Sequence, residues 1–367
     1  MNLTALNVIS RTVSFYGNSL TQSSYLFVKC YYHNSFSNFF YTKSINTNIA
    51  LKLCSFQNII NSAVIVDADE YGKVFSSPIS STSALMQVSH CQFKSISSGN
   101  PILFYQNSVG TLLVDNTLFY SCVSTGLAGG LHIEGSYKSS ISNCCFRKCK
   151  APARQAIWAR YTAFFDFIMN TVSQCSPKDS KGENDGVSFS TIDYMKYYSI
   201  NTTDCHVTVS SVSLQLVKIN NSVLMYSSFV NNSDAYASNE GSIGMWEISN
   251  STMSFNNYIG LVYSSYCISI DALSNISISD SVFRRNSKTK YINNVGILRI
   301  FSCFFDVSAT IAGVNSPHNQ YETIQSDIRL VHLNTFYCMG QFQAITHISP
   351  MNKIYNRYSL IFLVLTC

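Results

Sequence analysis

The sequence predicts an all-β protein built as a solenoid, with coils of about 27 residues. Three observations support this fold class. One short pattern recurs along the chain, and a period of roughly 20–50 residues indicates a solenoid or a related repeat architecture. The composition is rich in β-branched, aromatic and small polar residues, which favour strands and turns over helices. No segment carries the apolar stripe of an amphipathic helix over three turns.

The recurring pattern is an aliphatic residue, a spacer, Asn or Asp, a small residue, a second spacer and a large apolar residue. It is clearest in Val114–Phe119 and Ile141–Phe146. Further copies begin at Ile168, Ile219, Ile248, Ile278 and, more loosely, His332. The Asn and Asp residues are separated by 27, 27, 51, 29, 30 and 54 residues. Since the two long steps are close to two ordinary ones, we expect a degenerate copy in each gap, at Ile200–Thr203 and at Phe301–Phe304.

Each position of the pattern has a structural role in a β-solenoid. Equivalent residues of successive coils stack about 4.8 Å apart, so a large apolar residue in every coil builds a continuous core. Asn tolerates the left-handed backbone conformation that a sharp bend between two strands requires. We therefore expect bends and a buried stack at the following repeat positions: Asn116, Phe119, Asn143, Phe146, Asn170, Asn221, Leu224, Asn250, Met253, Asp280, Phe283 and Asn334.

The 13 cysteines partly follow the same period, and the chain contains no C-x-x-C motif. Two groups keep nearly constant positions relative to the apolar residue of each copy: Cys54, Cys91 and Cys144, and Cys122, Cys149 and Cys175. Because a free cysteine behaves as a small apolar residue, this placement favours buried thiols that stack from coil to coil. A disulfide framework is the alternative, but the even cysteine count and short chain typical of one are absent.

The chain is expected to contain three segments. Residues 1–50 form an N-terminal cap or poorly registered first coils, residues 51–340 form the repeats, and residues 341–367 form a C-terminal cap or the start of a truncated apolar segment. The apolar residues 360–365 fall far short of the roughly 20 that a membrane helix needs. The first ten residues lack the basic region and long apolar core of a secretory signal. Contact with a membrane is therefore expected only through a segment missing from this chain.

The composition excludes two broad classes of protein. Only 12% of the residues are charged while 46% are hydrophobic, which argues against a disordered chain. The net charge of +5 is small for this length, and no long Lys/Arg block suggests a nucleic-acid partner. No motif indicates a cofactor, so none is predicted.

Two acidic clusters are the candidates for a metal or catalytic site. They are Asp67, Asp69 and Glu70, and Asp179, Glu183 and Asp185. The first cluster begins like a calcium loop, but Pro78 at its twelfth position excludes an EF-hand. Turn chemistry alone accounts for these residues, so both clusters are weak metal candidates and no catalytic residue is assigned.

Arg147, Lys148, Lys150, Arg154 and Arg160 form one basic concentration. Such a group can bind acidic glycans or anionic surfaces, but an ordinary solvated outer face is the favoured interpretation. Four histidines fall on or near repeat positions without a second ligand at metal spacing, so we expect them to pack in the core or at its edge: His90, His132, His206 and His332.

Four-residue motifs in the repeats resemble those of a known family. Phe229–Asn232 and Phe283–Asn286 match the F-x-x-N signature of the polymorphic outer-membrane-protein repeats, and Gly129–Ile133 resembles their companion G-G-[AIL] signature. Phe119–Cys122 and Phe146–Cys149 carry Cys in the place of Asn. The chain is especially similar to the large surface repeat proteins of this kind in chlamydiae and in parasitic protists such as trichomonads.

This resemblance implies a right-handed parallel β-helix of the pectate-lyase-like type over about residues 50–340. It also implies a non-enzymatic scaffold for adhesion or interaction, at the cell surface or secreted, with host or cell-surface proteins or glycans as partners. The alternative is a carbohydrate-active β-helix enzyme, either a polysaccharide lyase or a glycoside hydrolase, because this fold also occurs among enzymes that act on polysaccharides.

Overall fold

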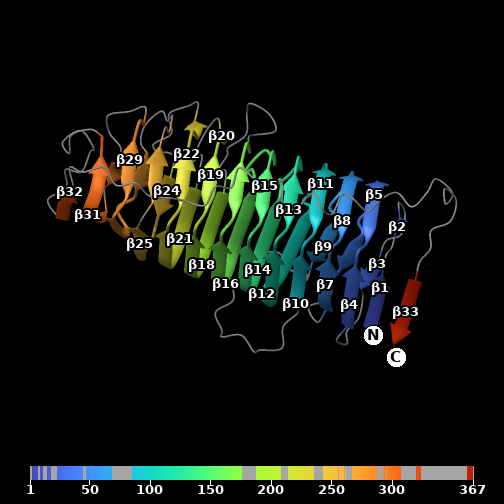
Figure 1. The fold of residues 1–367 in the computed structure, drawn as a ribbon. Coiled ribbons are helices and arrows are strands. Elements are labelled where there is room, and N and C mark those ends of the chain that lie inside the picture. The colour runs from blue at the N-terminus through green and yellow to red at the C-terminus, as the bar shows by residue number, and fades with distance from the viewer. Residues whose placement is uncertain are drawn as a thin grey trace.

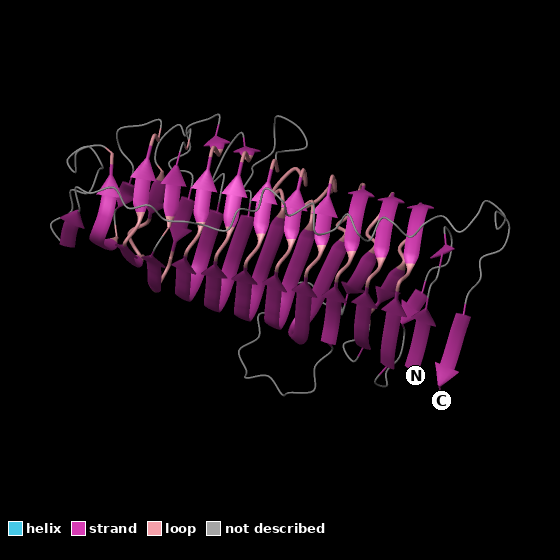
Figure 2. Ribbon diagram, in the orientation of Figure 1, coloured by secondary structure: helices cyan, strands magenta, loops and turns pink. Residues whose placement is uncertain are grey.

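The chain folds as a parallel β-solenoid, which confirms the predicted fold class and the spacing of about 27 residues. The computed structural model describes residues 2–6, 9–10, 15–17, 23–43, 47–67, 85–175, 187–207, 214–234, 243–254, 256–259, 261, 267–286, 292–294, 296–306, 320–323 and 362–366. These residues contain strands and no helix (Figure 2). Successive coils lie side by side along one long axis (Figure 1).

Each coil contributes strands to three faces of the solenoid. Face one begins with β1 (Asn2–Leu6), β4 (Ser23–Val28), β7 (Thr47–Lys52) and β10 (Leu85–Ser89). It continues with the second halves of five long strands: β12 (Ile102–Asp115), β14 (Leu131–Ser142), β16 (Ile157–Ile168), β18 (Val187–Tyr198) and β21 (Leu214–Met225). It ends with β25 (Asn250–Ser254), β28 (Asn275–Ser279) and β31 (Ile297–Phe305).

Face two follows face one along each coil. It contains β2 (Ile9–Ser10), β5 (Tyr31–Ser35), β8 (Ser55–Ile59), β11 (Gln92–Ile96), β13 (Leu118–Tyr120), β15 (Cys145–Arg147), β17 (Thr171–Ser173), β19 (Asn201–Thr203), β22 (Ser228–Val230), β26 (Asn257–Ile259), β29 (Val282–Arg284) and the end of β31.

Face three completes the coil. It contains β3 (Phe15–Gly17), β6 (Phe40–Thr42), β9 (Val64–Asp67), the first halves of β12, β14, β16, β18 and β21, then β24 (Ile243–Trp246), β27 (Ile268–Ile270) and β30 (Ile292–Asn294). Beyond the faces, β20 (His206–Val207) pairs with β23 (Ser233–Asp234), and β32 (Gln320–Thr323) pairs with β31. The strand β33 (Phe362–Thr366) pairs antiparallel with β1, whereas the other described pairings are parallel.

A single left-handed residue makes the bend between face one and face two. Asn116, Asn143 and Asp280 occupy this position with φ values of 46°, 53° and 49°, as the sequence predicts. In other coils the bend residue is Met169 or Tyr226, with φ values of 55° and 53°. Since large side chains adopt this conformation here, the bend does not depend on Asn.

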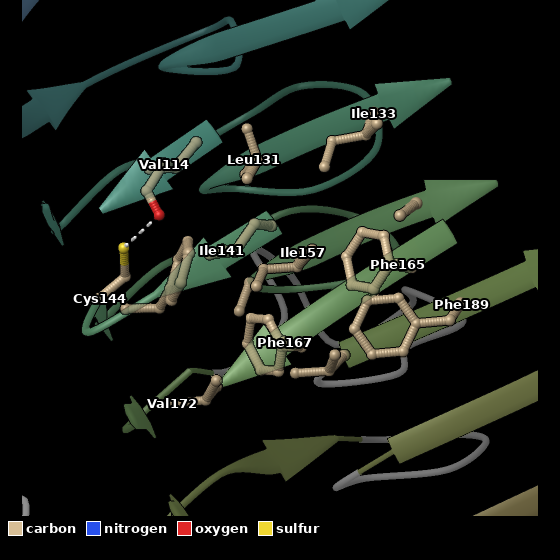
Figure 3. Close-up of a cluster of buried hydrophobic side chains, with 14 of the residues drawn as sticks. Val114, Leu131, Ile133, Ile141, Cys144, Ile157, Phe165, Phe167, Val172 and Phe189 are labelled. Atoms are coloured by element: carbon tan, nitrogen blue, oxygen red, sulfur yellow. Dashed lines mark hydrogen bonds between the residues drawn. The ribbon is translucent and has the colours of Figure 1, made fainter. Parts of the chain in front are cut away.

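The aromatic stack predicted from the repeat lies on face two. The rings of Phe56, Phe93, Phe119 and Phe146 stack with centroids 4.8, 5.2 and 4.6 Å apart along consecutive coils. Val172 and Thr202 interrupt this row. In those two coils the aromatic rings of Phe167 and Tyr197, on face one just before the bend to face two, fill the core instead. Figure 3 shows Phe167 beside Val172. The row then resumes with Phe229, Tyr258, Phe283 and Phe305.

The structure corrects the alignment of five predicted repeat residues. Asn170 follows the bend residue Met169 and is fully buried. Leu224 and Met253 lie in the row of Val114 and Ile141, two residues before the bend residue, and not in the row of Phe119. Asn221 and Asn250 therefore lie within or at the start of face-one strands. The two degenerate copies are confirmed, since Ser199 and Ser302 are the bend residues of those coils. Asn334 lies outside the described residues.

Buried Asn residues next to the bends bind the preceding coil. The side chain of Asn170 donates to the Ile141 carbonyl at 2.8 Å and accepts the Cys144 N–H at 2.8 Å. The side chain of Asn232 likewise donates to the Thr202 carbonyl and accepts the Cys205 N–H, both at 2.9 Å. This arrangement explains the Asn of the F-x-x-N motif, because its amide satisfies a donor and an acceptor that the bend leaves unpaired.

Ten cysteines of the described residues are free and buried, as expected from their placement on the repeat. In several coils the cysteine directly follows the bend between face one and face two, as Cys54, Cys91 and Cys144 do. In others it directly follows the left-handed residue that ends face two. Figure 3 shows the Sγ atom of Cys144 pointing to the Val114 carbonyl. Cys145, which packs with Leu118 outside the main core, is disulfide-bonded.

We expect Phe119→Ala to lower the free energy of unfolding by about 3–5 kcal/mol, since it removes a ring between two stacked neighbours and leaves a cavity. Urea denaturation followed by circular dichroism measures the change. Phe36→Ala is the matched control, because that side chain is 80% exposed and its loss should change stability by less than about 0.5 kcal/mol. Equal effects of the two substitutions would contradict the buried stack.

Asn170→Ala should destabilise the protein by about 1–3 kcal/mol for each group that it leaves unpaired, namely the Cys144 N–H and the Ile141 carbonyl. The same denaturation experiment on Asn221→Ala provides the control, because Asn221 is exposed within a strand. If both variants unfold at the same urea concentration as the unmodified protein, the buried amide does not hold the coils together.

Candidate functional site

The acidic candidates do not form a described site. Asp67 ends β9 and is partly exposed, while Asp69, Glu70, Asp179, Glu183 and Asp185 lie outside the described residues. In the part of the chain that the structure describes, no three His, Cys, Asp or Glu side chains are grouped to hold a metal ion.

The basic concentration divides into two groups. Arg147, Lys148 and Lys150 surround the bend after β15, where Arg147 Nε donates to Gln174 Oε1 at 3.2 Å. Arg154 and Arg160 lie instead against Trp158 on face three. The five basic residues therefore do not form one patch, because the chain turns from face two to face three between the two groups.

The second group belongs to a polar and aromatic cluster on the outer side of face three. We call it the Trp158 cluster and define it as Tyr105, His132, Glu134, Arg154, Trp158 and Arg160. The strand register places Tyr105 opposite Glu134, His132 opposite Trp158, and Glu134 opposite Arg160. Their neighbours Ile133 and Ala159 point the other way, into the core.

Contacts within the Trp158 cluster are close. The guanidinium group of Arg160 binds the Glu134 carboxylate, and His132 Nε2 lies 3.6 Å from Glu134 Oε2. The guanidinium carbons of Arg154 and Arg160 lie 4.7 and 4.5 Å from the centre of the Trp158 ring, in cation–π geometry. Trp158 is only 5% exposed and His132 only 6%, so these side chains close the centre of the cluster to solvent.

Beside its two guanidinium groups, the cluster holds one carboxylate and one imidazole. Burial lowers the pKa of His132 and outweighs the opposing effect of Glu134, so the imidazole stays neutral near neutral pH. Burial alone would raise the pKa of Glu134, but its interactions with His132, Tyr105 and Arg160 lower it. Because Glu134 is ionised, it has no proton to donate as a general acid near neutral pH.

An exposed row of aromatic rings adjoins this cluster on face one. Tyr137, Phe164 and Tyr194 come from β14, β16 and β18, which lie side by side in Figure 1. Each ring is about 40% exposed, and the centroids are 5.5 Å and 6.5 Å apart. Tyr161, at the bend between faces three and one, lies 5.0 Å from the Arg160 guanidinium. We call Tyr137, Phe164 and Tyr194 the aromatic ladder.

Sequence reasoning missed both the Trp158 cluster and the aromatic ladder. Alternation within β16 would have placed Trp158 and Arg160 on the outer side once this segment was assigned as a strand. Beyond them the bend at Tyr161 interrupts the alternation, since Thr162 and Phe165 both point inward. The outward position of Phe164 therefore could not be deduced from a simple two-residue period.

Comparisons with protein-family models, with curated proteins and with solved structures give no match. Within the described residues, no helix has the length and apolar character needed to cross a membrane.

The lowered pKa values of His132 and Glu134 predict that the protein loses stability in acid. An unfolded His takes up a proton near pH 6.5, before folded His132 does, so stability falls as the pH drops from about 6.5 to the lower folded pKa. Glu134 contributes stability above about pH 4.3 that is lost as the pH falls through its folded pKa.

His132→Gln should therefore weaken the change in urea midpoint between pH 7.5 and pH 5.5, because the substituted side chain does not titrate. His90→Gln serves as the control, since His90 is exposed at a bend. An unchanged pH dependence in the His132 variant would show that His132 is not the responsible group.

Proposed function

We propose that the protein is a non-enzymatic scaffold for adhesion or interaction, displayed at a cell surface or secreted, and that the aromatic ladder is its contact surface. The exposed row formed by Tyr137, Phe164 and Tyr194 is the observation that carries this proposal. Partly exposed Tyr and Phe rings supply large contact areas with few rotatable bonds, which is typical of residues that dominate binding energy.

The ladder is well suited to binding because its backbone is fixed. Phe164 and Tyr194 are direct register partners, and Tyr137 precedes Lys138, the register partner of Phe164. Because all three residues lie on long paired strands, the rings need little ordering when a partner binds. Polar and charged groups flank them, including Lys138 opposite Phe164, and Asp193, whose carboxylate accepts a hydrogen bond from Asn220 at 2.9 Å. Host or cell-surface proteins and glycans are both suitable partners for such a surface.

The structural roles of the motif residues support the proposed likeness to the polymorphic outer-membrane-protein repeats. Asn232 and Asn286 bind the preceding coil in the same way, and Cys122 and Cys149 occupy the equivalent row. Gly130 has a role of its own, because a Cβ atom there would lie 2.6 Å from the Ala156 carbonyl oxygen of the next coil. The G-G motif thus allows two coils to approach closely.

A carbohydrate-active enzyme is the alternative. Incubation of the purified protein with polygalacturonate, alginate and related glycans in the presence of Ca²⁺ distinguishes the two proposals. Unsaturated or shortened products would support the enzyme and overturn the non-enzymatic scaffold.

The ladder itself is tested by the triple variant Tyr137→Ser, Phe164→Ser and Tyr194→Ser. Binding of the protein to glycan arrays and to cultured cells should fall by about 30-fold or more, since loss of central aromatic contacts typically costs at least about 2 kcal/mol. Leu273→Ser is the matched control, because Leu273 is 71% exposed and lies outside the ladder. Equal binding by both variants would place the contact surface elsewhere.

A further inference from the structure

Four buried cysteines occupy the same position in four consecutive coils. Cys122, Cys149, Cys175 and Cys205 each follow the left-handed residue that ends face two, and each is fully buried. The strands before them pair in register, from β13 to β15, β17 and β19. The structure therefore forms a row of thiols along the solenoid axis.

The sulfur atoms of this row are placed alike. Cys122 Sγ contacts the Phe93 carbonyl of the preceding coil at 3.4 Å, and Cys149 Sγ contacts the equivalent Phe119 carbonyl at 3.7 Å. Each also contacts the carbonyl two residues before it, at 3.5 and 3.9 Å. Since the two side chains make the same contacts one coil apart, their sulfurs are separated by about the coil rise, roughly 4.8 Å.

This separation suits one kind of metal coordination. A zinc–thiolate bond is about 2.3 Å long and a bond to two-coordinate Cu(I) is somewhat shorter, so two thiolates slightly more than about 4 Å apart can hold this ion on the line between them. The coil rise of roughly 4.8 Å comes close to that distance, and small changes in the cysteine side-chain torsions supply the rest without movement of the backbone. Soft thiolate ligands suit Cu(I), zinc and iron–sulfur clusters, and of these Cu(I) is the one that two thiolates alone can hold, since a structural zinc site takes four ligands.

Positive charge surrounds the same bend. Lys148 and Lys150 directly flank Cys149 in the chain, Arg147 lies two residues before it, and Lys148 is exposed. A Cu(I) ion held by two thiolates carries one net negative charge, which these cations would partly offset.

We propose that Cys122 and Cys149 form a two-coordinate site for Cu(I). On binding, each thiol loses its proton and forms one S–Cu bond, so that one Cu(I) and two thiols give one anionic dithiolate complex and two protons. Copper is neither oxidised nor reduced in this step. Because protons are released, binding strengthens as the pH rises.

The test uses the protein of residues 1–367 with its free thiols kept reduced, and Cu(I) supplied anaerobically as its acetonitrile complex, in competition with bicinchoninate. The unmodified protein should remove Cu(I) from the coloured chelator complex, and X-ray absorption should show two sulfur neighbours, no third ligand, and bonds shorter than the roughly 2.3 Å of a zinc–thiolate bond. Cys149→Ser and Cys122→Ser should each lower the amount of copper bound per chain. Ser35 occupies the same row in an earlier coil, so Ser fits this position.

Cys267→Ser is the matched control, because Cys267 is also free and fully buried but lies on another part of the coil. It should bind as much copper as the unmodified protein. Equal losses in the three variants, or no loss in either the Cys122 or the Cys149 variant, would overturn the proposal. If the Cys149 variant does not fold, a copper environment with three sulfurs or with nitrogen ligands in the unmodified protein would overturn it independently.

Discussion

Hydrogen bonds between neighbouring coils at the bends hold this solenoid together. At the first bend, Asn116 N–H donates to the Ser142 carbonyl of the next coil, and Leu118 N–H donates to the Cys91 carbonyl of the preceding one. A left-handed residue other than Gly costs roughly 1–2 kcal/mol. The bonds on both sides offset this cost in each coil, so the bend is a property of the stack and not of one residue.

This constraint explains which parts of the fold can be predicted from the sequence. Asn116, Asn143 and Asp280 favour the bend conformation themselves, and Phe119, Phe146 and Phe283 follow them at a fixed distance, so these copies were recognisable. Met169 and Tyr226 adopt the same conformation only because the neighbouring coils impose it. No local preference marks them. The pattern was therefore matched to the wrong residues in their coils, such as Asn221 and Leu224.

The same repetition separates structural positions from positions available for function. Inward side chains are committed to the stack, whereas outward side chains on the long strands of β14, β16 and β18 are free to vary. That is where Trp158, Arg160 and the exposed ring of Phe164 lie. In the core, the same repetition brings the thiols of Cys122 and Cys149 to equivalent positions in neighbouring coils. The geometry of the coil thus defines both the proposed contact surface and the proposed copper site.

Amide hydrogen exchange at the bends tests the central claim most directly. If neighbouring coils impose the bends, the N–H groups of Met169 and Tyr226, which donate to the Tyr198 and Ser254 carbonyls, are protected as strongly as those of strand residues such as Phe165. Exchange of these two N–H groups at the rate of an unprotected loop, while the strands remain protected, would contradict the account.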